Sequence, residues 1–330
     1  MKKLIHFIYI LILICFFVQP SHAQQLKIID QQTKNSYRGI STYKNYIWIS
    51  GANGFVGYSK DNGITWQYQQ IKGFEKIDFR DIHVFDENNI IIMGIASPAY
   101  ILRSNDAGKT WKTVYSNNDP NAFLDAFYFT KNKGICLGDP IHQKPFTIIT
   151  NDYGNTWQEK NILKPNIIDG EAFYAASGTN ILFHKNKYFA VSGGTKSRLL
   201  MNKKTIPLPT MQGLKMTGAN SIAQWGKSLV IVGGDYENLN RNDSVAAFSN
   251  NEGKTWQISK TQPNGYKSCV IYIKKNILIA CGLTGVDISK DGGNNWQNIS
   301  KLSFNSCVYN QDYHTVYFCG ANGQIGKLNF

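Results

Sequence analysis

The sequence predicts an all-β protein, a seven-bladed β-propeller of four-stranded antiparallel blades. Three observations carry this prediction. One eight-residue pattern recurs along the chain at near-regular spacing, short apolar segments alternate with turns rich in Gly, Asn and Asp, and no segment has helical periodicity. The five copies of the pattern begin at Ser59, Ser104, Thr150, Ser249 and Ser289. The long interval before the fourth copy spans two periods, so we expect one degenerate copy there.

The repeated pattern reads SKDNGITW in residues 59–66 and is explained by turn chemistry. Its carboxylate or amide accepts hydrogen bonds from backbone N–H groups of its own turn, and its Gly supplies a positive φ. Its Trp then begins a strand and packs between neighbouring sheets. Asn251 stands where the other copies have Asp, and Asn295 stands where they have Thr. We expect a structural turn between the third and fourth strands of a blade, on the face opposite any site.

Repetition of the segments around this pattern divides the chain into seven units. They begin near Arg38, Arg80, Leu124, Gly170, Asn220, Lys267 and Asn305. The fourth unit has residues 199–205 in place of the eight-residue pattern. The seventh unit ends at Phe330 after three strands, so residues 26–31 are expected to supply its outer strand and close the ring.

The first 23 residues have the features of a signal peptide. Lys2 and Lys3 precede an apolar run over residues 4–18, and small residues at Ser21 and Ala23 resemble a cleavage site. We therefore assign residues 1–23 to a signal peptide and residues 24–330 to a single propeller, exported to the periplasm or secreted. No later stretch is apolar enough for a membrane span.

The net charge of +13 comes from scattered lysines. No basic run interleaves with aromatic residues, so a nucleic-acid partner is excluded.

Five cysteines follow the signal segment, an odd number that excludes complete pairing within the chain. Cys269 and Cys281 are twelve residues apart, as are Cys307 and Cys319, and each pair flanks an expected hairpin. Two interpretations stay open, namely cross-strand disulfides and small buried strand residues. The cysteine spacing predicts no zinc site.

The starts of the seven inner strands predict a polar pocket on the propeller axis. Two adjacent positions there carry charged, small or amide residues where a core strand should be apolar. The loops on the same face add further polar groups. We expect a ligand or a partner to bind through Arg38, Arg80, Asp81, Asp125, Asp139, Glu171, Asp235, Tyr236 and Lys267. Self-paired or solvated carboxylates are expected in place of a calcium site, so no metal is predicted.

Several phrases at these positions resemble one bacterial family. They are Arg38-Gly39-Ile40-Ser41, Phe79-Arg80-Asp81-Ile82, Gly138-Asp139-Pro140, residues 170–179, Gly233-Gly234-Asp235-Tyr236 and Gly265-Tyr266-Lys267-Ser268. The family is similar to the photosystem II stability/assembly factors, whose propeller repeats are called BNR or Asp-box repeats. The resemblance implies a non-catalytic binding scaffold that holds a protein partner at its axial face.

The Asp-box is also found in bacterial sialidases, and this weaker resemblance implies an alternative. The chain would then be a glycoside hydrolase with a glycan at the same face, acting through Asp125, Glu171 or Asp81. An arginine triad would combine Arg38 and Arg80 with Arg198 or Arg241, although the motif around Arg38 lacks the Ile-Pro that follows Arg in sialidases. No dinucleotide-binding motif or redox cluster is visible, so no cofactor is expected.

Overall fold

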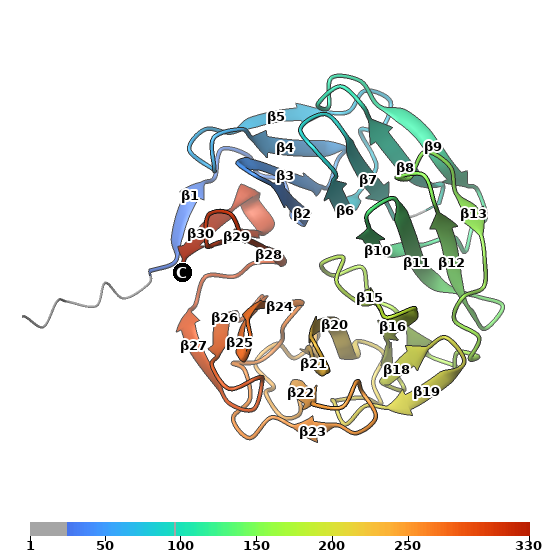
Figure 1. The fold of residues 1–330 in the computed structure, drawn as a ribbon, viewed down its shortest axis with the longest axis vertical. Helices are drawn as coiled ribbons and strands as arrows, with labels where there is room; N and C mark the ends of the chain where they lie inside the picture. The colour runs from blue at the N-terminus through green and yellow to red at the C-terminus, as the bar shows by residue number, and fades with distance from the viewer. Residues whose placement is uncertain (1–24, 96) are drawn as a thin grey trace, which may run out of the picture.

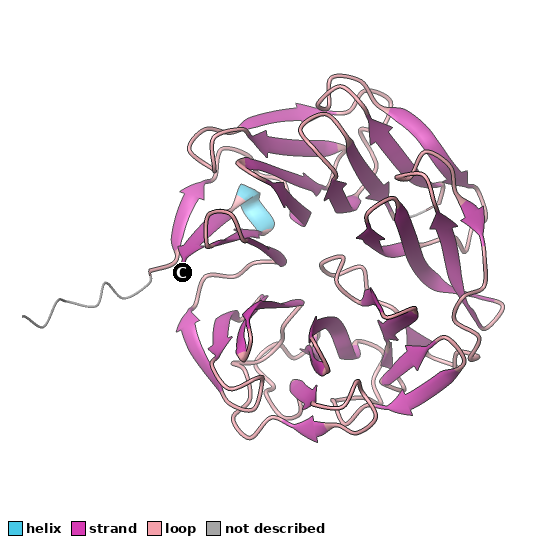
Figure 2. Ribbon diagram, in the orientation of Figure 1, coloured by secondary structure: helices cyan, strands magenta, loops and turns pink. Residues whose placement is uncertain are grey.

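The computed structural model describes residues 25–95 and 97–330, and the predicted signal peptide lies outside them. Within these ranges the strands form seven antiparallel sheets arranged around a central axis (Figure 1). The described part contains one short 3₁₀ helix, η1 (Ala321–Gly323), and otherwise strands and loops (Figure 2). The predicted all-β, seven-bladed propeller is confirmed.

Each blade has four strands, numbered outward from the axis. The first blade contains β2 (Tyr37–Tyr43), β3 (Tyr46–Gly51), β4 (Phe55–Ser59) and β5 (Gln67–Gln70). The second blade contains β6 (Phe79–Val84), β7 (Ile90–Gly94), β8 (Ala99–Ser104) and β9 (Lys112–Asn117). The third blade contains β10 (Leu124–Thr130), β11 (Lys133–Ile141), β12 (Lys144–Thr150) and β13 (Gln158–Glu159). The fourth blade contains β15 (Ile181–His184), β16 (Lys187–Val191), β18 (Arg198–Met201) and β19 (Lys204–Pro207). The fifth blade contains β20 (Thr217–Trp225), β21 (Ser228–Asp235), β22 (Ala246–Ser249) and β23 (Gln257–Ile258). The sixth blade contains β24 (Cys269–Lys274), β25 (Ile277–Gly282), β26 (Gly285–Ser289) and β27 (Trp296–Ser300).

The seventh blade joins the two ends of the described chain. Its inner strands are β28 (Ser306–Asn310), β29 (Thr315–Cys319) and β30 (Ile325–Asn329), and its outer strand is β1 (Lys27–Asp30). β1 runs antiparallel to β30, with Lys27 opposite Lys327. The first strand thus covers an edge that would otherwise expose unpaired backbone groups.

The predicted start of the fourth unit at Gly170 was wrong. The inner strand of this blade is β15, which begins at Ile181, and β18 and β19 occupy the place of the degenerate repeat. Glu171 belongs instead to the two-residue strand β14 (Glu171–Ala172), which pairs with β17 (Gly193–Gly194) beside the fifth blade. Residues 173–180 therefore do not form part of the blade, and they reach the centre of the ring ahead of β15 (Figure 1).

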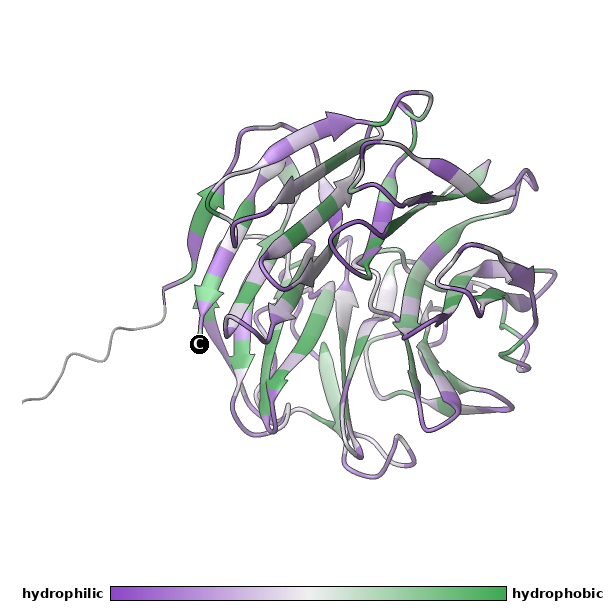
Figure 3. Ribbon diagram, turned by 45° about the horizontal axis from the view of Figure 1, so that its top comes forward, coloured by the Kyte–Doolittle hydropathy of each residue, from purple (hydrophilic) through white to green (hydrophobic). Residues whose placement is uncertain are grey.

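Apolar side chains fill the spaces between successive blades. One such cluster contains Trp48 from the first blade and Ile90, Ile92 and Leu102 from the second, all completely buried. Figure 3 shows hydrophobic residues concentrated in the strands and hydrophilic residues in the connecting loops. Both faces of most sheets are covered, so burial of the β-branched and aromatic residues stabilises the ring as one unit.

The eight-residue repeats lie at the turn between the third and fourth strands, as predicted. In the first copy the Asp61 carboxylate accepts the backbone N–H of Thr65 at 2.8 Å, and Gly63 has a φ of 84°. The Thr65 hydroxyl also donates to Asp61, and this bond together with the Thr65 N–H holds the pKa of Asp61 down at about 2. Ser59 is opposite Ile47, which is opposite Thr42 near the end of β2, so the repeat lies away from the start of the inner strand. The copies are therefore structural.

The five cysteines of the described chain are free and buried. Cys269 lies opposite Cys281 on adjacent strands, whereas Cys319 lies opposite Ser306. Cys307 and Cys319 are therefore not cross-strand partners, and the structure has buried thiols at both of the pairs that the sequence left open.

Candidate functional site

β-bulges shape the starts of the inner strands. In β2, β6, β10 and β20 the pairing with the next strand skips one residue. The skipped residues are Arg38, Arg80, Asp125 and Asn220. A bulge re-aims side chains that strict alternation would send to opposite faces. Asp125 is thus equivalent to Arg38 and Arg80, so the predicted start of the third unit at Leu124, which would make Leu124 their equivalent, was wrong by one residue.

A cavity of about 630 Å³ opens at this end of the axis. Three of the four bulged residues line it, together with aromatic side chains and parts of the 170–176 segment. The lining includes Arg38, Arg80, Asp139, Glu171, Tyr174, Ala175, Ala176, Lys215, Asn220, Tyr236 and Tyr266. A pocket of this size, apolar over much of its wall with a few polar groups, is typical of ligand sites.

Residues 175–179 plug the channel below the cavity. The hydroxyl of Ser177 donates to the Ser268 carbonyl at 2.7 Å, and the Ser177 carbonyl accepts from the Ser306 hydroxyl at 3.1 Å. Thr179 and Ser221 share a hydroxyl contact of 2.6 Å. Gly178 has a φ of 72°, and a Cβ there would lie 2.4 Å from the Asp81 carboxyl carbon. These contacts with four blades close the channel, so the cavity has a floor.

Each of the two arginines that line the cavity keeps guanidinium N–H donors that no described residue accepts. Arg80 donates from Nε to Asp78 at 2.8 Å and contacts the Ala175 carbonyl at 3.4 Å. Arg38 contacts the Ala176 carbonyl at 3.4 Å and forms no ion pair with any described residue. A guanidinium has five N–H donors in a planar fork that matches a carboxylate. Both groups can therefore hold the plug and still bind an anion.

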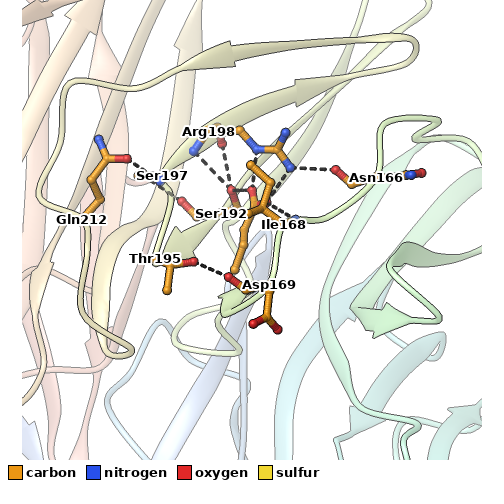
Figure 4. Close-up of polar contacts among 9 residues, drawn as sticks. Asn166, Ile168, Asp169, Ser192, Thr195, Ser197, Arg198 and Gln212 are labelled. Atoms are coloured by element: carbon orange, nitrogen blue, oxygen red, sulfur yellow. Dashed lines mark hydrogen bonds and ion pairs between the residues drawn. The ribbon is translucent and has the colours of Figure 1, made fainter.

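Glu171 lines the cavity but is already paired. Both of its carboxylate oxygens accept from Arg198, at 2.8 Å for Nε to Oε1, and the Ile168 N–H donates to it at 2.9 Å. Figure 4 shows Arg198 within this network, between Ser192 and Asn166. The side chain of Glu171 is fully buried, and a bidentate pair of this kind is strong and directional. We assign Glu171 to the support of the cavity wall.

Three predicted aspartates lie around the second and third blades. Asp139 lines the cavity, accepts the Phe173 N–H at 3.2 Å, and has a pKa raised to about 6 by burial. Asp81 accepts the N–H groups of Ile82 and Phe127 at 2.8 and 2.7 Å, and burial raises its pKa to about 8. Asp125 is completely buried with no hydrogen-bond partner among the described residues, and burial raises its pKa well above the usual value. Asp81 and Asp125 do not line the cavity.

Asp235 and Lys267 are also separated from the cavity. Asp235 caps its own turn by accepting the N–H groups of Glu237 and Asn238, each at 3.0 Å. Lys267 is completely buried and contacts Asp287 at 2.9 Å. Its ammonium also donates to the Asn264 carbonyl and the Thr284 hydroxyl, so all three protons are used. Of the nine predicted residues, the cavity thus brings together Arg38, Arg80, Asp139, Glu171 and Tyr236.

The arrangement does not favour the hydrolase alternative. Glycoside hydrolysis needs two carboxyl groups on opposite sides of the scissile bond. Glu171 is held by Arg198, and Asp125 has no exposed surface. Arg198 is therefore unavailable to an arginine triad, and Arg241 lies outside the cavity with Asp243 at 2.7 Å.

Two tyrosines of the site were not predicted. Tyr266 is buried, and its ring meets the ring of Tyr236 edge-on at 5.5 Å. Tyr174 donates its hydroxyl to the Lys215 carbonyl at 2.8 Å. Both tyrosines occur in phrases that carried the family resemblance, and a run of small residues after Tyr174 was the available signal for the plug.

The fold and this cavity define a class: a seven-bladed propeller with a plugged axis and a cationic, aromatic pocket at one mouth. Residues 19–122, which include Arg38 and Arg80, match the family model described as Photosynthesis system II assembly factor YCF48. This match confirms the predicted resemblance over the first two blades. None of the curated proteins compared with the chain matches it.

Solved structures support the same fold. The structure of YCF48 bound to D1 peptide is 16% identical, with a TM-score of 0.65, and the match covers 92% of this chain and 97% of that one. YCF48 from Cyanidioschyzon merolae is 16% identical, with a TM-score of 0.63 over 92% and 98% of the two chains. The Pan2 WD40 domain of Neurospora crassa is 10% identical, with a TM-score of 0.61 over 89% of each. Among the described residues, no helix has the length and apolar character needed to cross a membrane.

Proposed function

We propose that this chain is a non-catalytic binding propeller that holds a polypeptide partner at the axial cavity. The observation that carries the proposal is Arg38, a cavity-lining guanidinium without an ion-pair partner among the described residues. Arg80 beside it keeps free donors, and Tyr236 and Tyr266 offer aromatic surface. Such a site favours a carboxylate flanked by an apolar or aromatic group, because arginine and tyrosine are the residues that dominate binding energy at interfaces.

The comparisons support a protein partner in preference to a glycan. The family model that matches residues 19–122 is that of an assembly factor, and one similar propeller has been solved with a bound peptide. The partner that fits this cavity is a peptide segment that presents an acidic side chain or a C-terminal carboxylate. The proposal includes export of the chain after cleavage of residues 1–23, which rests on the sequence of that segment.

A peptide panel tests the proposal. Fluorescently labelled peptides with free or amidated C-termini, and with Glu or Gln inside, are titrated with the purified protein. We expect the carboxylate forms to bind at least about tenfold more tightly, and Arg38→Gln to remove that preference, because a charge-assisted bond is worth roughly 1.5–3 kcal/mol. Arg241→Gln is the matched control, since it removes an arginine that does not line the cavity. If the carboxylate peptides bind no more tightly than the amidated and Gln peptides to Arg241→Gln, as to Arg38→Gln, the proposed site is rejected.

A further inference from the structure

Three thiols meet in the wall of the channel, although the sequence spacing gave no hint of it. They belong to Cys269 on β24, Cys281 on β25 and Cys307 on β28. Their sulfur atoms all lie within 4.8 Å of one another, and the Sγ atoms of Cys269 and Cys307 are 3.7 Å apart. The side chains are 0%, 0% and 3% exposed. The cluster joins the sixth blade to the seventh.

Rigid strands hold the three sulfur atoms in place. Cys269 and Cys281 are directly opposite each other in one sheet, and Cys307 comes from the inner strand of the next blade. All three residues belong to one apolar core cluster, which restricts their rotamers. The Thr179 hydroxyl, at the end of the plug, lies 3.8 Å from the Cys269 sulfur and can donate to it. A ligand would therefore find the donor atoms already assembled.

The sulfur positions suit a single metal ion. Ligands bound at about 2.3 Å place sulfur atoms about 3.8–4.0 Å apart, in either a planar three-coordinate or a tetrahedral arrangement. The 3.7 Å separation of Cys269 and Cys307 is close to this, and the other separations need only small rotations. A disulfide would use two of the three sulfur atoms and leave the third unexplained.

The donor set selects the kind of ion. Thiolates prefer soft ions, of which Cu(I) and Zn(II) are the common cases. The group among the described residues contains three Cys and no fourth Cys, His, Asp or Glu. Structural Zn(II) sites are almost always four-coordinate, so three thiolates alone leave Zn(II) one protein ligand short. Cu(I), a d¹⁰ ion, accepts three ligands in a plane.

We propose that Cys269, Cys281 and Cys307 form a three-coordinate site for a soft monovalent ion of the Cu(I) class. Each thiol that binds the ion releases its proton to solvent, and no electron is transferred. Because the sulfur atoms are buried, the ion enters as the chain folds or when the sixth and seventh blades separate. Binding then stabilises the closed ring, since the ion has affinity for the folded arrangement.

Anaerobic titration of the reduced protein tests this site. Cu(I) is supplied from a chromogenic chelator, and the expected result is one tightly bound ion per chain, with ultraviolet sulfur-to-copper charge transfer and an increased melting temperature. X-ray absorption of the loaded protein should show three sulfur neighbours and no nitrogen or oxygen.

Two variants separate the cluster from other thiols. Cys269→Ser should lose the bound ion, whereas Cys136→Ser should retain it, because Cys136 is buried in a different cluster. If Cys269→Ser does not fold, Cys307→Ala takes its place, and the sulfur count of the loaded protein remains decisive. No retained Cu(I), the same retention in Cys269→Ser, preference for Zn(II), or an intact disulfide in the protein as isolated would each overturn the proposal.

Discussion

Removal of the buried Lys267 ammonium should destabilise the propeller strongly. Lys267 and Asp287 have side-chain exposures of 0% and 1%, and their charged atoms are 2.9 Å apart. Lys267→Met leaves the Asp287 carboxylate buried without its counter-charge. Loss of one partner from a buried pair costs about 3–5 kcal/mol, so we expect the free energy of unfolding to fall by that amount.

The double variant gives the sharper test. In Lys267→Met/Asp287→Leu no charge is left unpaired, but the Asn264 N–H that donates to Asp287 at 3.0 Å loses its acceptor. That loss costs about 1–3 kcal/mol, so the double variant should be less destabilised than Lys267→Met alone by about 2 kcal/mol, and by still more than that relative to the sum of the two single variants. Urea unfolding followed by Trp fluorescence measures all three. The exposed pair Lys185–Glu252 is the control, with an expected coupling below about 1 kcal/mol. Additive effects at Lys267 and Asp287 would refute a buried structural pair.

Two further predictions concern Asp81, which is buried, and Asp61, which lies in the turn of the first repeat. Burial raises the pKa of Asp81 to about 8 from an unfolded value of 3.8, so the folded state holds a proton that the unfolded state has lost between pH 4 and 8. The free energy of unfolding should therefore fall as pH rises, by about 1.4 kcal/mol per pH unit from this group. Asp81→Asn removes this dependence, and the wild-type-minus-variant difference should change by about 2.7 kcal/mol between pH 5 and 7; parallel curves would contradict it. At the first repeat, Asp61→Ala should cost about 1–2 kcal/mol and Asp61→Asn less than about 0.5, because the Asn251 amide already accepts the Thr255 N–H at 3.0 Å in the fifth blade. Equal losses in the two variants, measured by denaturant unfolding, would show that this contact is not what stabilises the turn.

The repeats could be predicted from the sequence because their chemistry is local. The side chain, the Gly and the Trp of each copy lie within eight residues, so one pattern specifies both the turn and the start of the next strand. The same reasoning failed at Gly170, where Glu171 resembled the acidic start of an inner strand. Its tertiary partner Arg198 decides its position, and a single sequence does not show which charges will pair.

The candidate site was predicted in part for a similar reason. Polar residues at the strand starts indicated a hub site, but the bulges decide which of them reach the cavity. Arg38 and Arg80 occupy skipped positions and line the cavity, whereas Asp125 occupies the equivalent position and is buried. A bulge shifts the register by one residue, which alternation of residue types cannot reveal when both neighbouring positions are polar.

The charge that the cavity presents to a partner depends on which of its charged side chains already form ion pairs within the propeller. Of the two carboxylates in the cavity wall, Glu171 is paired with Arg198, and Asp78 beside the cavity is paired with Arg80. Asp139 is the wall carboxylate that has no ion pair with any described residue, and burial raises its pKa to about 6. Arg38 keeps its charge without an ion-pair partner among the described residues, and Lys215 adds another at the rim. An anionic group on a partner therefore meets positive charge that the propeller itself has not neutralised, and this explains why a carboxylate should select this mouth of the channel.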